Sequence, residues 1–389
     1  MSPGDQRVAV VVGALLVHLV VLGTIYSFGV FLEPVADDLG IRTGTASIVL
    51  SINLATMLVT GRFVATLTDR MASGAVPVAG AVLVIAGLAS LTVTRSTLVL
   101  FAGFGLTFGA GAGLLIVPSV AAVVRTASAS TGLATGIAVS GAGIGSVVIA
   151  PLAAWLIRVR SWRFAAGSLT LALAPVLLTA ILLVARAAPT AAPAAPSVRV
   201  RVRGDGALRT LYWSTVVLSF GLMVPFVHLA PFAERHGATS SEAALLVSAL
   251  AAANTAGRLS FGALADRVGR RRTLLTVITV MGIALMLWPL AQHRPTLVAF
   301  SLLFGLSAGG YFALLPAITG DYFDRSSLAE VNGILYFGSA AGTFAGPALV
   351  GVLSGSTRSF AIGAVLAGMT VLAGAAIAQR LPRHVSAPA

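Results

Sequence analysis

Long apolar stretches alternate with short polar connections along most of the chain. A helix that crosses a bilayer needs about 20 mostly apolar residues, and twelve stretches meet that requirement. We expect spanning helices over residues 8–33, 44–67, 75–94, 97–124, 131–157, 164–185, 208–233, 241–264, 273–291, 296–320, 328–354 and 359–379. Glycine and proline inside these stretches are compatible with helices, because neighbouring helices in a membrane satisfy the freed backbone groups. The pattern predicts an all-α membrane protein with twelve transmembrane helices.

Composition supports this interpretation and narrows the chemistry. Hydrophobic residues make up 57% of the chain and charged residues 10%, whereas soluble domains carry about 25% charged residues. The chain has no cysteine and no lysine, which excludes thiol nucleophiles, disulfides, Schiff bases and phosphate-binding lysine loops. It also lacks an HExxH motif, a GxSxG motif with triad partners and paired carboxylates in mid-span. We therefore expect no enzyme activity, no metal and no cofactor.

Positive charge is distributed as in a membrane protein. The net charge is +13, and the arginines that produce it lie in short runs between apolar stretches. Because positive residues favour the cytoplasmic side, this pattern indicates a membrane protein and not a nucleic acid partner. Arginines are more frequent on the side of both termini, which predicts cytoplasmic N- and C-termini in the cell membrane; the cluster from Arg158 to Arg163 is an exception. The first apolar run exceeds the about 7–15 residues of a signal-peptide core, so we expect no cleavable signal.

The two halves of the chain repeat each other at an offset of 197 residues. Leu, Pro, Ala and Gly recur at corresponding places in the segments 32–40 and 229–237. Glycines of the fifth and eleventh stretches also correspond, namely Gly136, Gly141 and Gly145 with Gly333, Gly338 and Gly342. Parallel repeats of six helices are typical of transporters whose halves rock about a site at the membrane midplane.

Domain boundaries follow from the repeat and from a change in composition. Between the sixth and seventh stretches the chain is rich in Ala, Pro and Arg and shows no apolar periodicity, as in a flexible linker. We expect an N-terminal six-helix bundle over 1–185, a cytoplasmic linker over 186–207 and a C-terminal six-helix bundle over 208–389.

The polar connection after the eighth stretch has a distinctive order of residues, Gly262-Ala-Leu-Ala-Asp266-Arg267-Val-Gly269-Arg270-Arg271. Here an aspartate can pair at a helix end, a glycine permits a tight turn, and arginines can bind a facing helix end or lipid head groups. The segment resembles the cytoplasmic loop signature G-x-x-x-D-R-x-G-R-R of the major facilitator superfamily. The connection after the second stretch keeps only the aspartate and the first arginine. The resemblance implies a conformational latch formed by Gly262, Asp266, Arg267, Gly269, Arg270, Asp69 and Arg70.

Further motifs narrow the resemblance to one group. They are Tyr26-Ser-Phe-Gly-Val-Phe-Leu-Glu-Pro34, the glycine series from Gly132 to Gly145, Trp162-Arg163 and Asn254-x-x-x-Arg258. Over nearly the whole chain these motifs resemble the monocarboxylate porter and oxalate:formate antiporter group of the superfamily. The resemblance implies secondary transport of a small organic anion, with an arginine inside the membrane at Arg258.

Arg258 is also the main candidate from chemistry alone. It lies eight residues before Asp266, hence about 12 Å from the helix end, which is near the middle of an about 30 Å hydrocarbon core. A charge at that depth is costly unless it faces an aqueous cavity or a partner. The acidic residues of the chain are terminal, in connections or near span ends, so Arg258 is suited to receive an anion, and its planar fork matches a carboxylate. The alternative is that Arg258 snorkels or donates to backbone carbonyls.

Four other polar residues are candidates for the same substrate site. Asn254 lies one helical turn before Arg258 and can orient it. Tyr311 follows a glycine pair in mid-span, where small residues open space. Tyr26 falls where the oxalate porters have a substrate-lining tyrosine, although a transmembrane tyrosine also serves in packing. Ser339 stands where dicarboxylate porters have a second cation, and a single buried cation favours a monoanion.

Proton coupling has two histidine candidates, His18 in the first stretch and His228 in the seventh. Each can instead be a hydrogen-bonded packing histidine, and the substrate carboxylate can itself carry the proton. The monocarboxylate porters carry an aspartate at the place of Asn254, so the usual coupling carboxylate is in question here.

The leading hypothesis is a secondary active transporter of a small organic anion, a monocarboxylate, that works by alternating access with proton coupling. We expect a monomer in contact with membrane lipid. One alternative is an efflux transporter for a drug or specialised metabolite, because one fold serves many solutes. An alternative of another class is a transporter-like membrane receptor or sensor, against which the short connections argue.

Overall fold

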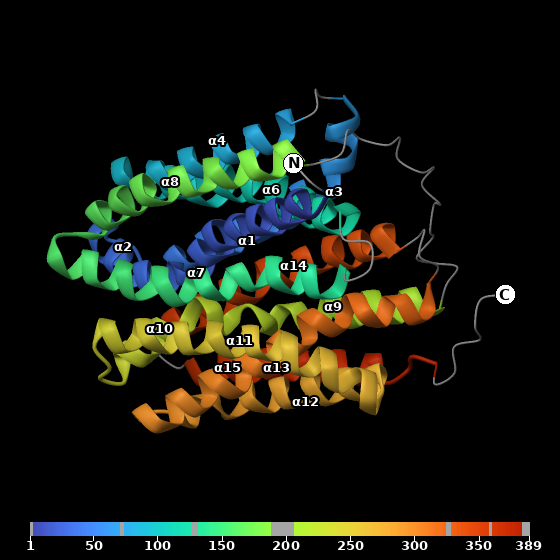
Figure 1. The fold of residues 1–389 in the computed structure, drawn as a ribbon. Helices are drawn as coiled ribbons and strands as arrows, with labels where there is room; N and C mark the ends of the chain where they lie inside the picture. The colour runs from blue at the N-terminus through green and yellow to red at the C-terminus, as the bar shows by residue number, and fades with distance from the viewer. Residues whose placement is uncertain are drawn as a thin grey trace. The chain divides into compact units, whose positions relative to one another are not determined.

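The computed structural model describes residues 3–70, 74–126, 131–187, 206–323, 328–357 and 360–382. Helices form all of the regular secondary structure in these residues (Figure 1). Twelve helical stretches are long and apolar enough to cross a membrane. The predicted all-α class and the number of spans are therefore confirmed.

The helices of the first part of the chain are α1 (Pro3–Ser27), η1 (Phe28–Phe31), α2 (Leu32–Leu39), α3 (Thr43–Arg70), α4 (Ala75–Val93), α5 (Thr97–Leu100), the π-helical η2 (Phe101–Phe108), α6 (Gly109–Thr126), α7 (Thr131–Val159) and α8 (Trp162–Ala187). The later helices are α9 (Gly206–Leu222), α10 (Val224–Arg235), α11 (Ser240–Val268), α12 (Arg270–Leu287), η3 (Trp288–Leu290), α13 (Arg294–Tyr322), α14 (Leu328–Thr357) and α15 (Phe360–Ala378).

The first span differs most from its predicted range. Expected to end near residue 33, it passes through a short 3₁₀ segment and continues as α2 to Leu39. Gly40 then ends the helix with φ +63°, a left-handed conformation that glycine adopts without steric cost. The carboxylates of Glu33, Asp37 and Asp38 therefore lie on helical turns and not in a connection.

The chain divides into two compact units. Unit 1 comprises Met1–Pro193 and Phe226–Ala251, and unit 2 comprises Ala194–Pro225 and Ala252–Ala389. Most of the predicted linker, residues 188–205, lies outside the described residues. The predicted division into bundles 1–185 and 208–389 stays a prediction.

Glycines form the seam between α1 and α7 in unit 1. A Cβ atom added to Gly141 would collide with the backbone of Leu15, and one added to Gly145 would collide with that of Leu19. Gly23 faces Gly145 in the same way, its added Cβ lying 2.7 Å from the Cα atom. Small residues thus let the two backbones approach closely, which is how helices associate in lipid.

The repeated glycines form an equivalent seam in unit 2. Added Cβ atoms at Gly338 and Gly342 of α14 would meet Tyr212 and the carbonyl oxygen of Val216 on α9. Gly346, one turn further along, is blocked by the backbone of Phe220. The sequence repeat therefore corresponds to a repeated mode of helix packing, in which one glycine-lined helix contacts the first helix of its half.

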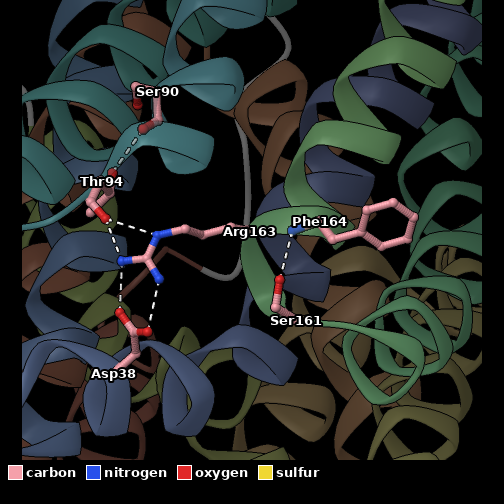
Figure 2. Close-up of polar contacts among 6 residues, drawn as sticks. All are labelled: Asp38, Ser90, Thr94, Ser161, Arg163 and Phe164. Carbon is pink, nitrogen blue, oxygen red and sulfur yellow. Dashed lines mark hydrogen bonds and ion pairs between the residues drawn. The ribbon is translucent and has the colours of Figure 1, made fainter.

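Arg163 joins three elements at one end of unit 1 (Figure 2). Its Nη1 and Nη2 atoms donate to the two carboxylate oxygens of Asp38 at 2.8 and 2.7 Å. Nε and Nη2 also donate to the backbone oxygen of Thr94 at 3.1 and 2.6 Å. The arginine cluster from Arg158 to Arg163 departs from the predicted charge distribution. One of its members stabilises the fold, because Arg163 connects α8 with α2 and with the end of α4.

Candidate functional site

Arg258 lies well inside α11, which continues for ten residues beyond it to Val268. Its Nε atom donates a hydrogen bond to Oδ1 of Asn254 at 3.1 Å, so the predicted contact between these residues is present. The guanidinium carbon lies 5.1 Å from the ring centroid of Phe312 on α13, within the range of a cation–π interaction. Both of these contacts are with neutral side chains.

Asn254 accepts a hydrogen bond from Arg258 and has an unsatisfied hydrogen-bond donor. Its side chain is buried, and among the described residues its Nδ2 atom has no hydrogen-bond partner. An unsatisfied buried donor costs about 1–3 kcal/mol, so a ligand oxygen that accepts from it recovers this free energy. The amide is thus oriented with its oxygen on Arg258 and its nitrogen available.

Close packing of α13 against α11 fixes the surroundings of this pair. A Cβ atom added to Gly309 would collide with the backbone oxygen of Asn254, and one added to Gly257 with that of Leu306. Because both positions are glycine, α13 approaches near enough to place Phe312 beside the guanidinium group. The glycine pair before Tyr311 therefore serves helix contact, in addition to any space that it opens.

Tyr311 and Ser339 lie on neighbouring helices of unit 2. The Tyr311 hydroxyl donates to Thr215 Oγ1 of α9 at 3.5 Å. Ser339 is buried and donates to the backbone oxygen of Tyr336 at 2.7 Å. Tyr336 and Ser339 thus lie on α14, and Tyr311 lies on α13.

Sequence reasoning missed three residues of this region: Phe312, Tyr336 and Thr215. Two of them carried a usable signal, because Phe312 is adjacent to Tyr311 and Tyr336 lies three residues before Ser339, on the same helical face. No local pattern pointed to Thr215, whose contact depends on how α9 meets α13.

The remaining candidates lie in unit 1 and are described with it. Tyr26 is buried and its ring stacks on Phe226 of α10 with centroids 4.6 Å apart. His18 is also buried, with Nδ1 at 2.8 Å from the backbone oxygen of Ala14, and which atom carries the proton depends on the tautomer. His228 is buried on α10. The roles assigned to these residues stay predictions.

The predicted latch segment forms defined contacts within unit 2. Gly269 has φ +102°, a conformation that suits glycine, at the junction of α11 and α12. Arg270 Nη1 donates to Asp321 Oδ1 at the end of α13, at 2.6 Å. Arg271 Nη2 donates to the backbone oxygen of Gln379 at 2.6 Å. The sequence did not single out Asp321, although it is an acid at the end of a span on the expected cytoplasmic side.

Other members of the predicted latch are less informative. Arg267 is exposed, and a Cβ atom added to Gly262 would meet open space. The side chains of Asp266, Asp69 and Arg70 lie outside the described part of the structure. In the described residues, no group of three or more His, Cys, Asp or Glu side chains is placed to hold a metal ion.

Comparison with known proteins places these features in context. A family model described as Major Facilitator Superfamily matches residues 14–226 and 211–388. Monocarboxylate transporter 13 of Rattus norvegicus is 28% identical over 388 residues, which cover 97% of this chain and 89% of the relative. Monocarboxylate transporter 11 of Mus musculus is 28% identical over 382 residues, covering 93% and 84%. The MFS-type transporter pynF of Aspergillus niger is 26% identical over 401 residues, covering 97% and 88%.

A solved structure has the same fold. It is the crystal structure of a bacterial homolog to the human lysosomal transporter Spinster in an inward-facing and occupied conformation. The two chains superpose with a TM-score of 0.76 over 96% of each, at 16% sequence identity. The arrangement of twelve spans is thus shared with a transporter whose sequence has diverged widely.

Proposed function

Because this chain belongs to the major facilitator superfamily and is therefore a membrane transporter and not an enzyme, we propose that it carries a small organic monocarboxylate by alternating access. Within the superfamily it resembles the monocarboxylate transporters. The proposal takes the substrate class from the chemistry of Arg258 and its neighbours as well as from this likeness.

The observation that carries the proposal is the cation inside α11, which is hydrogen-bonded to Asn254 and lies over the ring of Phe312. Nε of Arg258 donates to Asn254, and the planar guanidinium fork has the geometry to bind a carboxylate through two parallel hydrogen bonds. Each hydrogen bond to a charged group contributes about 1.5–3 kcal/mol. A single such cation balances a single negative charge, which favours a monoanion over a dianion.

Neighbouring groups suit the rest of such a substrate. The free Nδ2 donor of Asn254 accommodates one more oxygen. The ring of Phe312 offers aromatic surface beside the charge, suited to a short organic chain. Tyr311 and Ser339 complete the set on unit 2, and we also propose Tyr26 of unit 1 as a substrate-binding residue.

We extend the proposal to proton coupling, with His18 and His228 as candidate carriers and the substrate carboxylate as a third. Both histidines are buried within spans, where a charge is costly, so uptake of a proton by either is tied to a change of surroundings. We also propose a monomer in the cell membrane with both termini cytoplasmic, and a latch at Arg270.

Uptake into proteoliposomes tests the proposal. We expect a panel of short monocarboxylates to include at least one that the protein accumulates, and an inward proton gradient to increase that accumulation. Replacement Arg258→Gln is expected to abolish uptake while the purified protein keeps its melting temperature. The matched control is Arg62→Gln, which removes an exposed arginine of α3.

Three results would each contradict part of the proposal. Full uptake by the Arg258→Gln variant removes the anion site, and uptake of neutral or cationic drugs but of no carboxylate favours the efflux alternative. Ligand binding without any transport favours a receptor. An unchanged rate under an imposed proton gradient rejects proton coupling while leaving anion transport intact.

A further inference from the structure

The start of α12 and the end of α15 are joined in unit 2 by an arginine. Arg271 Nη2 donates to the backbone oxygen of Gln379, the residue directly after α15, at 2.6 Å. The residues next in sequence, Arg272 and Arg380, are both exposed. Because adjacent residues lie only about 3.8 Å apart along the backbone, this hydrogen bond brings the three arginines to one place on the surface.

Two glycines fix the depth of this contact in the membrane. Gly282 of α12 and Gly368 of α15 face each other, since a Cβ atom added to Gly368 would lie 2.8 Å from the backbone oxygen of Gly282. Each glycine lies near the middle of its span. Arg271 and Gln379 are each eleven residues from the glycine of their own helix, which is about 16 Å at the rise of an α-helix. Half of the hydrocarbon core is about 15 Å thick, so the arginines lie at the depth of lipid head groups.

The two exposed arginines continue an exposed apolar face of their helices. Arg272 lies eleven residues before Ile283 on α12, and Arg380 lies eleven residues after Met369 of α15. Eleven residues make nearly three helical turns, so the members of each pair lie on the same side. Ile283 is 46% exposed and Met369 54%, which suits both side chains to contact with acyl chains. A lipid whose chains lie along this face therefore brings its head group to the arginines.

The charge at this end of unit 2 selects for anions. Arg270 is paired with Asp321 at 2.6 Å, so the two charges of that pair balance. Within the residues that the structure describes, no carboxylate forms an ion pair with Arg271, Arg272 or Arg380. Three positive charges repel the choline or ethanolamine group of a zwitterionic lipid and attract a head group with net negative charge. The planar guanidinium fork also matches phosphate oxygens in pairs.

We propose that the seam between α12 and α15 binds an anionic phospholipid, with its phosphate between Arg272 and Arg380 and its acyl chains along the exposed apolar face. The bound lipid adds a second link between the two helices beside the hydrogen bond of Arg271, so it stabilises this end of unit 2. On the expected orientation the site faces the cytoplasmic leaflet. It uses none of the residues proposed for the substrate, so it goes beyond the proposed transport function and does not depend on it.

Native mass spectrometry of the purified protein in detergent tests the site. The probes are dioleoyl phosphatidylglycerol as the anionic lipid, and phosphatidylcholine and phosphatidylethanolamine with the same acyl chains as neutral lipids. We expect phosphatidylglycerol to bind at least about tenfold more tightly than either neutral lipid. Arg272→Gln and Arg380→Gln are each expected to weaken its binding about fivefold or more. Both side chains are exposed, so the melting temperature of the lipid-free protein should be unchanged.

The matched control is Arg294→Gln, which removes an exposed arginine at the start of α13. The end of α13 carries the partner of Arg270, so Arg294 lies at the opposite end of unit 2, and its replacement is expected to leave lipid binding unchanged. Equal binding of phosphatidylglycerol and the neutral lipids overturns the proposal. So does unaltered binding when Arg272 and Arg380 are both replaced, or an equal loss in the control.

Glycerol phosphate separates a lipid site from a site for soluble phosphate, because it has the head group without the acyl chains. We expect it to bind at least about tenfold more weakly than phosphatidylglycerol, since it buries no hydrocarbon. Equal affinity for the two would overturn the lipid site. No carboxylate is present in these measurements, so their failure leaves the anion site untouched. Conversely, the Arg258→Gln variant is expected to lose uptake and to bind phosphatidylglycerol as the unsubstituted protein does.

Discussion

The replacement Arg258→Lys separates two contributions to substrate binding, that of the positive charge and that of the guanidinium geometry. Lysine keeps a positive charge near the same depth, but its three donors diverge from one nitrogen. It therefore lacks the planar fork that can bind both oxygens of a carboxylate in parallel while Nε holds Asn254. The planar contact with Phe312 is also lost, since an ammonium group does not stack as a guanidinium does.

The expected loss of substrate affinity follows from the hydrogen bonds that the substitution removes. Losing one charge-assisted hydrogen bond to the substrate costs about 1.5–3 kcal/mol, which corresponds to about ten- to 150-fold weaker binding. The cation remains, so we expect weakened and not abolished recognition. Arg258→Gln removes the charge as well and is expected to fall below detection.

Binding and transport should be measured together on the purified protein. The rise in melting temperature on adding substrate reports how tightly the folded protein binds it. The substrate concentration for half-maximal uptake in proteoliposomes reports the behaviour of the whole transport cycle. We expect the lysine variant to shift both in parallel, with the melting temperature of the substrate-free protein unchanged. Equal substrate affinity in the unsubstituted protein and the Arg258→Lys variant would refute the bidentate geometry, because a point charge would then be sufficient for binding.

Further substitutions probe the surroundings of the same site. Asn254→Asp places a carboxylate beside Arg258, so we expect uptake to fall at neutral pH and to recover partly in acid, measured as a pH profile; a flat profile would show that the two groups do not interact. Gly309→Ala forces α13 away from α11, and we expect a loss of about 1–3 kcal/mol in thermal unfolding, whereas Gly320→Ala, with open space around it, should have little effect. Arg270→Gln breaks a half-exposed ion pair with the carboxylate at the end of α13, so we expect less than about 1 kcal/mol of destabilisation in denaturant unfolding, and a larger loss would show that solvent does not screen the pair.

Local patterns were sufficient for the elements and for contacts within one helix. Hydropathy predicted twelve spans because lipid demands apolar residues over a fixed length. The spacing of four residues predicted the bond from Arg258 to Asn254, since residues one turn apart face each other on a helix. The spacing of the glycines predicted the repeat, and the structure shows that several of these glycines lie at close helix contacts.

Contacts between distant segments were beyond the same patterns. The pairing of Arg163 with Asp38 spans 125 residues, and the backbone oxygen of Thr94 becomes its acceptor only because α4 ends beside α8. Phe312 likewise reaches Arg258 from another helix, α13.

The sequence by itself determined the membrane class, the number of spans, the repeat and the single mid-helix cation beside Asn254, because each depends on composition or on spacing within one helix. Only the tertiary structure decided that Phe312 lies beside Arg258, that Arg270 pairs with Asp321, and that Arg163 pairs with Asp38. The physical reason is that helices in lipid associate through shape and small-residue seams, and hydropathy carries no information about the rotation and depth at which two such helices meet.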